Sequence, residues 1–344
     1  MTMHVSGPKL GILAALAVLG LCALYVFGIF FSGNEFSGAA ERVFYVSRRE
    51  PFSAIVDSLA ANGIIRDKGK FVFVAKLYGG ASRLKVGKYV FHDGVSNSSI
   101  FLNLRSGHGN ELIPVTIPEG LLARSQARIL RRALGIDSAR YVELVHDKEF
   151  AGSLGVEGGS LEGYLFPQTY TFSWEQDERD VIRRQVEQFH LFYVDSLKAK
   201  AKEYGWTTLQ ALTFASIVEG EARRDDERAV IAGVYHNRLK RGMKLEADPT
   251  IQYILGSGPR RVLYADLRVD NPYNTYRYAG LPPGPVNNPG RASILASLFP
   301  DRNSFLYFVA DGMGGHRFSS TFAEHERNVR MYRRRRAHAI SSRQ

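Results

Sequence analysis

The sequence has one cysteine in 344 residues and no histidine pattern of the kind that binds a metal ion. Cys22 lies inside an apolar segment, so an intrachain disulfide and a thiolate metal site are both excluded. The nine histidines are scattered, and none forms the H-E-x-x-H pattern of a zinc-dependent hydrolase. We therefore expect a protein that works without a metal ion or an organic cofactor.

Acidic residues are outnumbered by basic ones, which gives a net charge of +11 and a sequence pI near 9.7. Such a balance favours anionic partners. The excess is concentrated near the C-terminus, in Arg327, Arg330, Arg333, Arg334, Arg335, Arg336 and Arg343. No zinc-finger, RNA-recognition or helix-turn-helix signature accompanies the charge, so nucleic acid is not an expected partner. A solvated helix end is the favoured interpretation of these arginines, and contact with anionic lipid heads is a minor one.

One long segment lacks charge and proline altogether, namely residues 10–31. As a helix it would span roughly 33 Å, enough to cross the hydrocarbon core of a bilayer. A cleavable signal peptide is the alternative, but its apolar region is normally about 7–15 residues long, with a small-residue cleavage site close behind. Lys9 before the segment and Glu35 and Glu41 after it favour a body outside the cytoplasm. The sequence thus predicts an uncleaved anchor with a short cytoplasmic tail.

The rest of the chain mixes helices and strands without regular βαβ units, which indicates the α+β class. A compact module is expected first, with a strand, two helices and a strand at residues 43–46, 51–62, 68–77 and 84–91. Later helices are expected at residues 181–202, 209–218, 226–241 and 322–336. The predicted divisions are residues 1–32 (tail and anchor), 33–40 (tether), 41–108 (module) and 109–344 (main domain with a basic tail).

A carboxylate ends the apolar run at residues 209–218, in the stretch that contains Glu219 and Glu221. A carboxyl group beside apolar packing loses hydration, and its pKa rises, as a general acid requires. Two residues on a helix are about 200° apart, so these carboxyl groups point to opposite sides and are not a pair acting on one bond. The pattern alone does not decide which of them faces a cleft, and a solvated charge is the ordinary role of either.

Several short motifs follow one another along the chain. They are Thr-Ile-Pro-Glu-Gly at 116–120, Leu-Glu-Gly-Tyr-Leu-Phe-Pro at 161–167, Ala-Ser-Ile-Val-Glu at 215–219, Asn-Arg-Leu at 237–239, Asp-Pro-Thr at 248–250, Tyr-Asn-Thr-Tyr at 273–276, Gly-Leu-Pro-Pro-Gly at 280–284 and Phe-Val-Ala-Asp-Gly at 308–312. In this order they resemble the membrane-anchored MltG or YceG-like endolytic murein transglycosylases. The resemblance covers roughly residues 41–330.

This resemblance implies cleavage of the β-1,4 bond between N-acetylmuramic acid and N-acetylglucosamine within a glycan strand, leaving a 1,6-anhydromuramyl end. It assigns the catalytic acid to Glu219. One acid suffices, because the C6 hydroxyl of the same muramyl sugar replaces water as the nucleophile. Candidates to line the cleft are Glu162, Asn237, Asp248, Thr250, Asn274 and Tyr276. Their alternative roles are turn capping and hydrogen bonding behind the cleft, and Glu119 is expected to cap the helix after it.

The resemblance also implies a location and partners. The body is expected on the periplasmic side of the cytoplasmic (inner) membrane, acting on peptidoglycan beside penicillin-binding proteins and the elongation or division machinery. The module at residues 41–108 is expected to be LysM-like. In this chain Arg48, Arg49, Glu50 and Pro51 replace the usual turn glycine before its first helix.

Two other functions remain open at this point. The chain could be an anchored wall-binding protein without catalysis, or a muramidase that admits water and releases a reducing end. The products of strand cleavage separate these alternatives, because only the transglycosylase yields anhydro ends.

Overall fold

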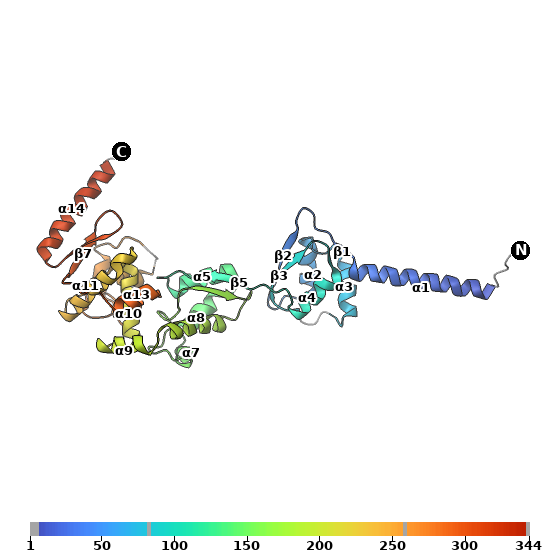
Figure 1. Cartoon of the computed structure of the whole chain (residues 1–344), viewed down its shortest axis with the longest axis horizontal. Helices are drawn as coiled ribbons and strands as arrows, with labels where there is room; N and C mark the ends of the chain where they lie inside the picture. The colour runs from blue at the N-terminus through green and yellow to red at the C-terminus, as the bar shows by residue number, and fades with distance from the viewer. Residues whose placement is uncertain (1–6, 81–83, 257–259, 342–344) are drawn as a thin grey trace. The chain divides into compact units, whose positions relative to one another are not determined.

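The computed structural model describes residues 7–80, 84–256 and 260–341, and the chain forms two compact units (Figure 1). The first unit is Met1–Pro114 with Thr171–Gln176, and the second is Val115–Tyr170 with Asp177–Gln344. The chain passes between them within strands β5 (Ile113–Thr116) and β6 (Thr169–Phe172). The tail before residue 7 and Arg343 lie outside the described residues.

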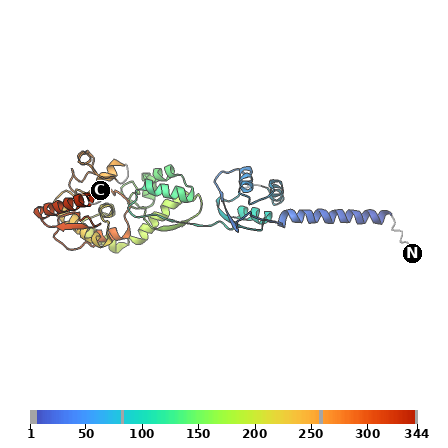
Figure 2. The same ribbon diagram turned by 90° about the horizontal axis from the view of Figure 1, so that it is seen from above.

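The predicted apolar helix is present as α1 (Gly7–Phe31), which extends away from the other elements of the first unit (Figures 1 and 2). Residues Ile12–Phe31 have a mean hydropathy of 2.6 and are almost wholly exposed. Only the last turns are covered, where Ile29 is 8% exposed. By length and composition α1 is able to cross a membrane.

The predicted order of strand, helix, helix and strand in the first unit is confirmed. Strand β2 (Glu41–Val46) pairs antiparallel with β3 (Gly87–His92), so that Phe44 lies opposite Tyr89. Helices α2 (Phe52–Ala61), α3 (Lys68–Leu77) and α4 (Asn97–Ser106) pack against this hairpin around one apolar core. Residues 33–40, predicted as a tether, hold the short strand β1 (Gly33–Asn34), which pairs with β4 (Val95–Ser96).

The second unit is mainly helical, and the α+β class is confirmed. Besides β5 and β6, its α-helices and strands are α5 (Ala123–Leu134), α6 (Ser138–Val145), α7 (Lys148–Ser153), α8 (Glu178–Phe192), α9 (Asp195–Glu203), α10 (Thr208–Glu221), α11 (Arg228–Lys240), α12 (Asp248–Leu255), α13 (Arg291–Leu298), β7 (Tyr307–Ala310), β8 (His316–Ser319) and α14 (Phe322–Ser341).

Two predicted helices have different limits in the structure. The single helix expected at 181–202 is wrong, because α8 and α9 are separated at Tyr193 and Val194. Tyr193 leaves the helical conformation and its ring stacks on Phe189 at 5.2 Å, so burial of the aromatic ring is associated with the break. The last helix continues beyond residue 336 to Ser341.

Helix α10 is the centre of the second unit. Residues 211–218 are all buried, and α11, α12 and α13 pack around the helix. A helix that is apolar on every side must be enclosed in this way. Its start is defined by a capping box, in which Thr207 accepts from the Gln210 backbone and Gln210 accepts from Thr207. The carboxylates at its other end are therefore carried by a rigid, buried element.

Two helical glycines give a matched test of packing. A Cβ at Gly233 in α11 would lie 2.4 Å from the Asp301 carbonyl oxygen, whereas a Cβ at Gly152 in α7 would meet nothing within 4 Å. We expect Gly233→Ala to lower the free energy of unfolding by about 1–3 kcal/mol through overpacking. Gly152→Ala should raise it by about 0.5–1 kcal/mol through helix propensity. Urea unfolding of the detergent-solubilised chain measures both, and equal effects would contradict this account.

Candidate active site

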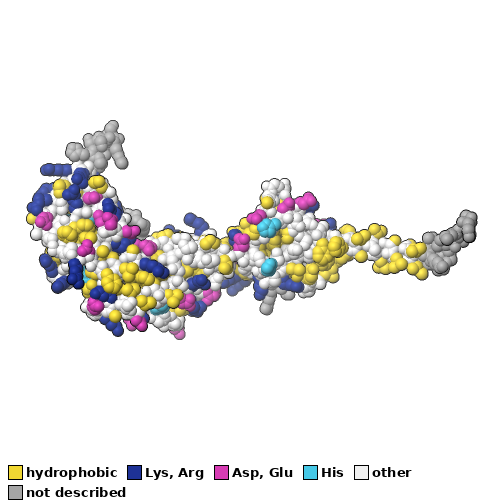
Figure 3. Space-filling model, viewed as in Figure 1, with side chains coloured by type: hydrophobic (Ala, Val, Ile, Leu, Met, Phe, Trp, Pro, Cys, Tyr) yellow, Lys and Arg dark blue, Asp and Glu magenta, His cyan; other side chains and the backbone are white. Residues whose placement is uncertain are grey.

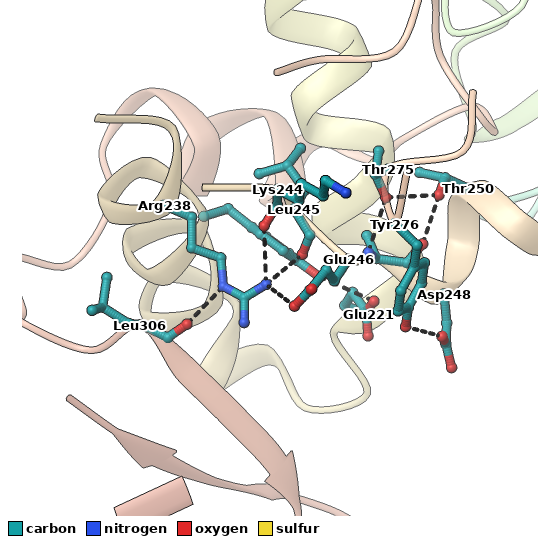
Figure 4. Close-up of polar contacts among 12 residues, drawn as sticks. Glu221, Arg238, Lys244, Leu245, Glu246, Asp248, Thr250, Thr275, Tyr276 and Leu306 are labelled. Atoms are coloured by element: carbon teal, nitrogen blue, oxygen red, sulfur yellow. Dashed lines mark hydrogen bonds and ion pairs between the residues drawn. The ribbon is translucent and has the colours of Figure 1, made fainter. Parts of the chain in front are cut away.

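The two carboxylates at the end of α10 face different surroundings. Glu221 lines a polar cavity of about 580 Å³, together with Tyr235, Arg238, Glu246, Asp248 and Tyr276. Figure 4 shows the polar contacts around Arg238, Asp248 and Tyr276. Strands β7 and β8 and helix α14 close another side of the cavity with Phe308, His316 and Tyr332. Glu219 does not line this cavity. The opposite directions expected from helix geometry are thus confirmed, and the cavity lies on the side of Glu221.

The environment of Glu221 favours a protonated carboxyl group. Burial raises its pKa to about 7, and the negative charge of Asp248 adds to the rise. The Tyr235 hydroxyl donates a hydrogen bond to Glu221 Oε1 at 3.1 Å, which partly opposes this rise. Near neutral pH the group therefore exchanges a proton readily, which is the property of a general acid and base.

Asp248 reaches Glu221 because α12 approaches α10 very closely. The contact is at Gly220, where a Cβ would lie 2.5 Å from Pro249 Cγ. Pro249 occupies the first turn of α12, a position where its missing N–H costs no helical hydrogen bond. The Tyr276 hydroxyl donates to Asp248 Oδ1 at 2.6 Å, and burial followed by this contact raises the pKa of Tyr276. Two of the predicted cleft residues, Asp248 and Tyr276, therefore meet at the cavity wall.

Arg238 fixes another part of the wall. Its guanidinium donates to the carbonyl oxygens of Leu306 at 2.7 Å and Leu245 at 2.9 Å, and it pairs with Glu246 at 3.1 Å. Glu246 has a φ of 50°, a left-handed conformation that is uncommon for a residue with a side chain. Such conformations are held by their surroundings and cluster at functional sites. Arg238 and Glu246 were both missed as site residues from the sequence.

Thr250 and Asn274 lie behind the cavity wall and are fully buried. The Thr250 hydroxyl is 2.9 Å from that of Thr275, which ties α12 to the neighbouring loop. Asn274 donates to the carbonyl oxygens of Leu267 and Val269 and accepts from the Tyr276 backbone. These two residues hold the segment that presents Tyr276. Hydrogen bonding behind the cleft is the alternative role that the sequence analysis gave for them.

Glu219 is enclosed in a network on the other side of α10. Its side chain is 8% exposed, and its Oε2 accepts from Ser293 Oγ at 2.7 Å, Gly290 N at 3.0 Å and Arg228 Nη1 at 3.3 Å. All three donors therefore meet at one oxygen of the carboxyl group. No hydrogen bond to its Oε1 occurs among the described residues. The network joins α10 to α11 and α13.

Glu119 lies in this same region, and the prediction that it caps the next helix is wrong. The cap residue of α5 is Leu122, which makes no side-chain cap. The Glu119 carboxyl instead packs against Gly290, where a Cβ would lie 1.9 Å from Glu119 Cδ. Burial raises the pKa of Glu119, and the adjacent charge of Glu219 adds to the rise.

Glu162 performs the capping at α5. Its Oε1 accepts from the Ala123 backbone at 3.0 Å and from Asn288 Nδ2 at 2.5 Å. Burial raises its pKa to about 7. Glu162 lines a second cavity of about 500 Å³ with Arg124, Tyr253 and Tyr273. Glu162 therefore does not line the cavity at Glu221.

Asn237 is also separate from that cavity, although its neighbour Arg238 lines it. Its amide donates to the carbonyl oxygens of Asn303 at 2.9 Å and Phe305 at 3.0 Å, holding the loop before β7. The sequence contained a signal for Arg238, because it lies three residues after Tyr235 on one face of α11. Among the described residues, no group of three His, Cys, Asp or Glu side chains could hold a metal ion.

The site therefore has one readily protonated carboxyl group at the wall of a polar cavity, with a phenol-bonded aspartate and a buried arginine beside it. This arrangement suits acid-base chemistry on a hydroxyl-rich ligand, since carboxylate, phenol and guanidinium groups all bind hydroxyl and amide groups.

The family model described as YceG-like matches residues 44–331, and the chain belongs to the YceG-like family. It is 34% identical over 295 residues to the endolytic murein transglycosylase of Bacillus subtilis, covering 81% of each chain. A protein of the same name from Streptococcus pneumoniae is 30% identical over 307 residues, covering 79% of this chain and 55% of that protein. The chain thus spans about half of the streptococcal relative.

The fold is similar to the crystal structure of a yceG-like protein from Listeria monocytogenes. The TM-score is 0.61 at 29% sequence identity, with 84% of this chain and 98% of that chain covered. The α+β fold is therefore similar to that of a solved yceG-like protein.

The raised pKa of Glu221 predicts a specific dependence of stability on pH. Between its ordinary value near 4.5 and about 7, the folded chain holds a proton that the unfolded chain has released, so this group's contribution to stability falls as the pH rises. Glu221→Gln should match wild type near pH 4 and exceed its free energy of unfolding at pH 8 by up to about 3 kcal/mol. Urea unfolding at several pH values measures the difference.

The matched control is Glu187→Gln on the exposed face of α8. Because this side chain is exposed, Glu187→Gln should not reproduce the gain in the free energy of unfolding at pH 8. If Glu221→Gln behaved like Glu187→Gln, the assigned environment of Glu221 would be wrong.

Proposed function

We propose that this chain is an endolytic murein transglycosylase. It cleaves the β-1,4 bond between N-acetylmuramic acid and N-acetylglucosamine within nascent glycan strands and so ends their elongation. The two curated relatives with this name support the reaction class. The observation that carries the assignment of a site is Glu221 at the wall of the polar cavity, with a pKa near 7.

In the proposed mechanism Glu221 acts twice. Its protonated carboxyl group gives the proton to the glycosidic oxygen, and the bond to C1 of the muramyl sugar breaks. The resulting carboxylate takes the proton of the C6 hydroxyl, whose oxygen closes onto C1. Protons balance without water, and the enzyme returns to its protonated form. A hydrolase with two catalytic carboxylates would need both at the bond, with room for water in the inverting case.

The groups around Glu221 suit this double role. The Tyr235 hydroxyl donates to Glu221 Oε1, and this hydrogen bond stabilises the carboxylate that acts as the base. Asp248 stays engaged with the Tyr276 hydroxyl at 2.6 Å, and its charge disfavours a second charge on Glu221. We assign Asp248, Tyr276 and Arg238 to the wall that faces the sugar. Thr250, Asn274, Asn237 and Glu162 hold the surrounding loops in this proposal.

Glu219, the acid implied by the resemblance, is the alternative acid. Its Oε1 accepts no hydrogen bond from the described residues and lies 3.8 Å from the place of a Cβ at Gly120. The geometry supports Glu221 better, because Glu219 uses its other oxygen in three hydrogen bonds that join helices.

We further propose that α1 is an uncleaved anchor that keeps the body on the periplasmic side of the cytoplasmic membrane. Support comes from its end, where Asn97 donates to the Ile29 carbonyl at 3.2 Å and Ser98 to that of Phe30 at 2.8 Å. Cleavage as a signal peptide would remove these partners from a buried asparagine. A leader that is removed has no need of such contacts.

The remaining parts of the proposal concern the module and the partners. The order β2, α2, α3 and β3 suits a LysM-like module at residues 41–108, with residues 1–32 as tail and anchor and 109–344 as the catalytic domain. Peptidoglycan strands are the substrate, and penicillin-binding proteins with the elongation or division machinery are the proposed protein partners.

Two amide variants test the reaction and its acid together. Full-length wild type, Glu221→Gln and Glu219→Gln are incubated with uncrosslinked glycan strands, and the products are identified by mass spectrometry. We expect wild type to give ends lighter by one water than a reducing end. Glu221→Gln should lower the rate at least about 100-fold, since it removes a general acid and base. Glu219→Gln should retain more than a tenth of the rate while folded.

The other outcomes discriminate between the alternatives. Loss of cleavage in Glu219→Gln with retention in Glu221→Gln would assign the acid to Glu219. Reducing ends would indicate a muramidase, and no cleavage by folded wild type would indicate a wall-binding protein.

A further inference from the structure

The outward face of α3 has an unusual composition. The helix contains three lysines and no acidic residue, and its inward side chains Phe71, Val74 and Ala75 are buried. Its outward stripe carries Phe73, 41% exposed, and Leu77, 59% exposed. The lysines at positions 70 and 76 flank these two side chains. Large apolar groups between lysines are typical of a helix that lies in a membrane interface.

This face continues the apolar surface of α1. Leu77 and Tyr78 line an open pocket of about 790 Å³ together with residues of α1 that include Val26 and Phe27. The rings of Phe30 and Tyr78 are 5.6 Å apart. Figure 3 shows hydrophobic side chains gathered where α1 joins the first unit. The outer end of the proposed anchor and the exposed side chains of α3 therefore form one apolar surface.

The position of α3 relative to the end of α1 is fixed by polar contacts. The last carbonyl groups of a helix lack partners within it. At the end of α1, those of Ile29 and Phe30 accept from Asn97 and Ser98 at the start of α4. Asn97 is only 6% exposed and also accepts from Asn34 at 3.1 Å. Helix α4 in turn packs against α3. The first unit is thus seated directly on the last turn of α1.

We propose that the outward face of α3 is a second membrane contact, a role that rests on the proposed anchoring by α1. Phe73 and Leu77 enter the boundary between acyl chains and head groups on the outer side of the bilayer. Lys70 and Lys76 extend to the lipid phosphates, as long basic side chains do at an interface. The partner is the bilayer surface, because the face is continuous with the surface of the helix that spans it. The first unit therefore lies on the membrane and does not turn freely above it.

Depth-dependent quenching in vesicles tests the contact with the full chain. The native Cys22 in α1 is the one cysteine of the sequence, so wild type carries a single environment-sensitive label in the proposed span. Two variants carry the label elsewhere, Cys22→Ser with Leu77→Cys and Cys22→Ser with Leu112→Cys. Leu77 and Leu112 are both 59% exposed, so they form a matched pair. Vesicles contain phosphatidylethanolamine, phosphatidylglycerol and a lipid with a spin label near its head group.

We expect the label at position 77 to be blue-shifted and quenched several-fold more than the label at position 112. Equal quenching at 77 and 112, with Cys22 protected from aqueous quenchers, would overturn the contact but leave the anchor intact. If the label at Cys22 were open to aqueous quenchers, the proposed anchor itself would fail. A protein covering α3 in place of lipid would likewise give no quenching at position 77 in these vesicles.

The lysines are tested in the Leu77→Cys background by adding Lys70→Glu and Lys76→Glu. Quenching at position 77 should fall in vesicles with phosphatidylglycerol and change little in vesicles of phosphatidylcholine. Unchanged quenching in both would overturn the assignment of the lysines to lipid phosphates. Both lysines are exposed, so the folded state should persist.

Discussion

The close approach of α12 to α10 is the constraint on which the site depends. It is possible because residue 220 has no side chain, and a Cβ there would lie 2.5 Å from Pro249 Cγ. The approach places Asp248 at the start of α12 beside Glu221 at the end of α10. Burial and this second carboxylate together raise the pKa of Glu221 to about 7. Without the glycine, the two helix ends would separate and the electrostatic coupling between these groups would weaken.

The two glutamates of α10 illustrate how surroundings assign different roles to one residue type. Glu219 has an arginine, a hydroxyl and a backbone N–H at a single oxygen, and these hydrogen bonds join three helices. Glu221 accepts from the Tyr235 hydroxyl and the Asp248 backbone, has the Asp248 carboxylate beside it, and lines a cavity. The hydrogen bonds of Glu219 hold neighbouring helices together, whereas burial beside a second carboxylate raises the pKa of Glu221 and favours its neutral form. The rigid burial of α10 maintains this contrast.

Much of the fold was predictable because it follows local periodicity. The strand, helix, helix and strand of the first unit, the apolar α1 and the buried α10 all have patterns that short-range rules interpret correctly. The break at Tyr193 was not predictable, because it depends on stacking with Phe189 and on burial of the ring. Turn capping was an alternative role for Glu162, but its partner at the start of α5 was not predictable, because the two lie 39 residues apart and Glu119 is nearer along the chain.

The candidate site was predictable only in part. Motifs drew attention to Asp248 and Tyr276, which do line the cavity, and to Thr250 and Asn274, which lie behind it. Arg238 and Glu246 were missed, because their importance comes from contacts with the carbonyl oxygens and loops around them.

By itself the sequence determined the α+β class, the apolar N-terminal helix and a helix ending in two carboxylates on opposite sides, because these features depend on periodicity and composition. Only the tertiary structure decided which carboxylate meets the cavity. That choice depends on where α11, α12 and α13 pack around α10, and a pKa responds to the burial and charges that such packing brings together.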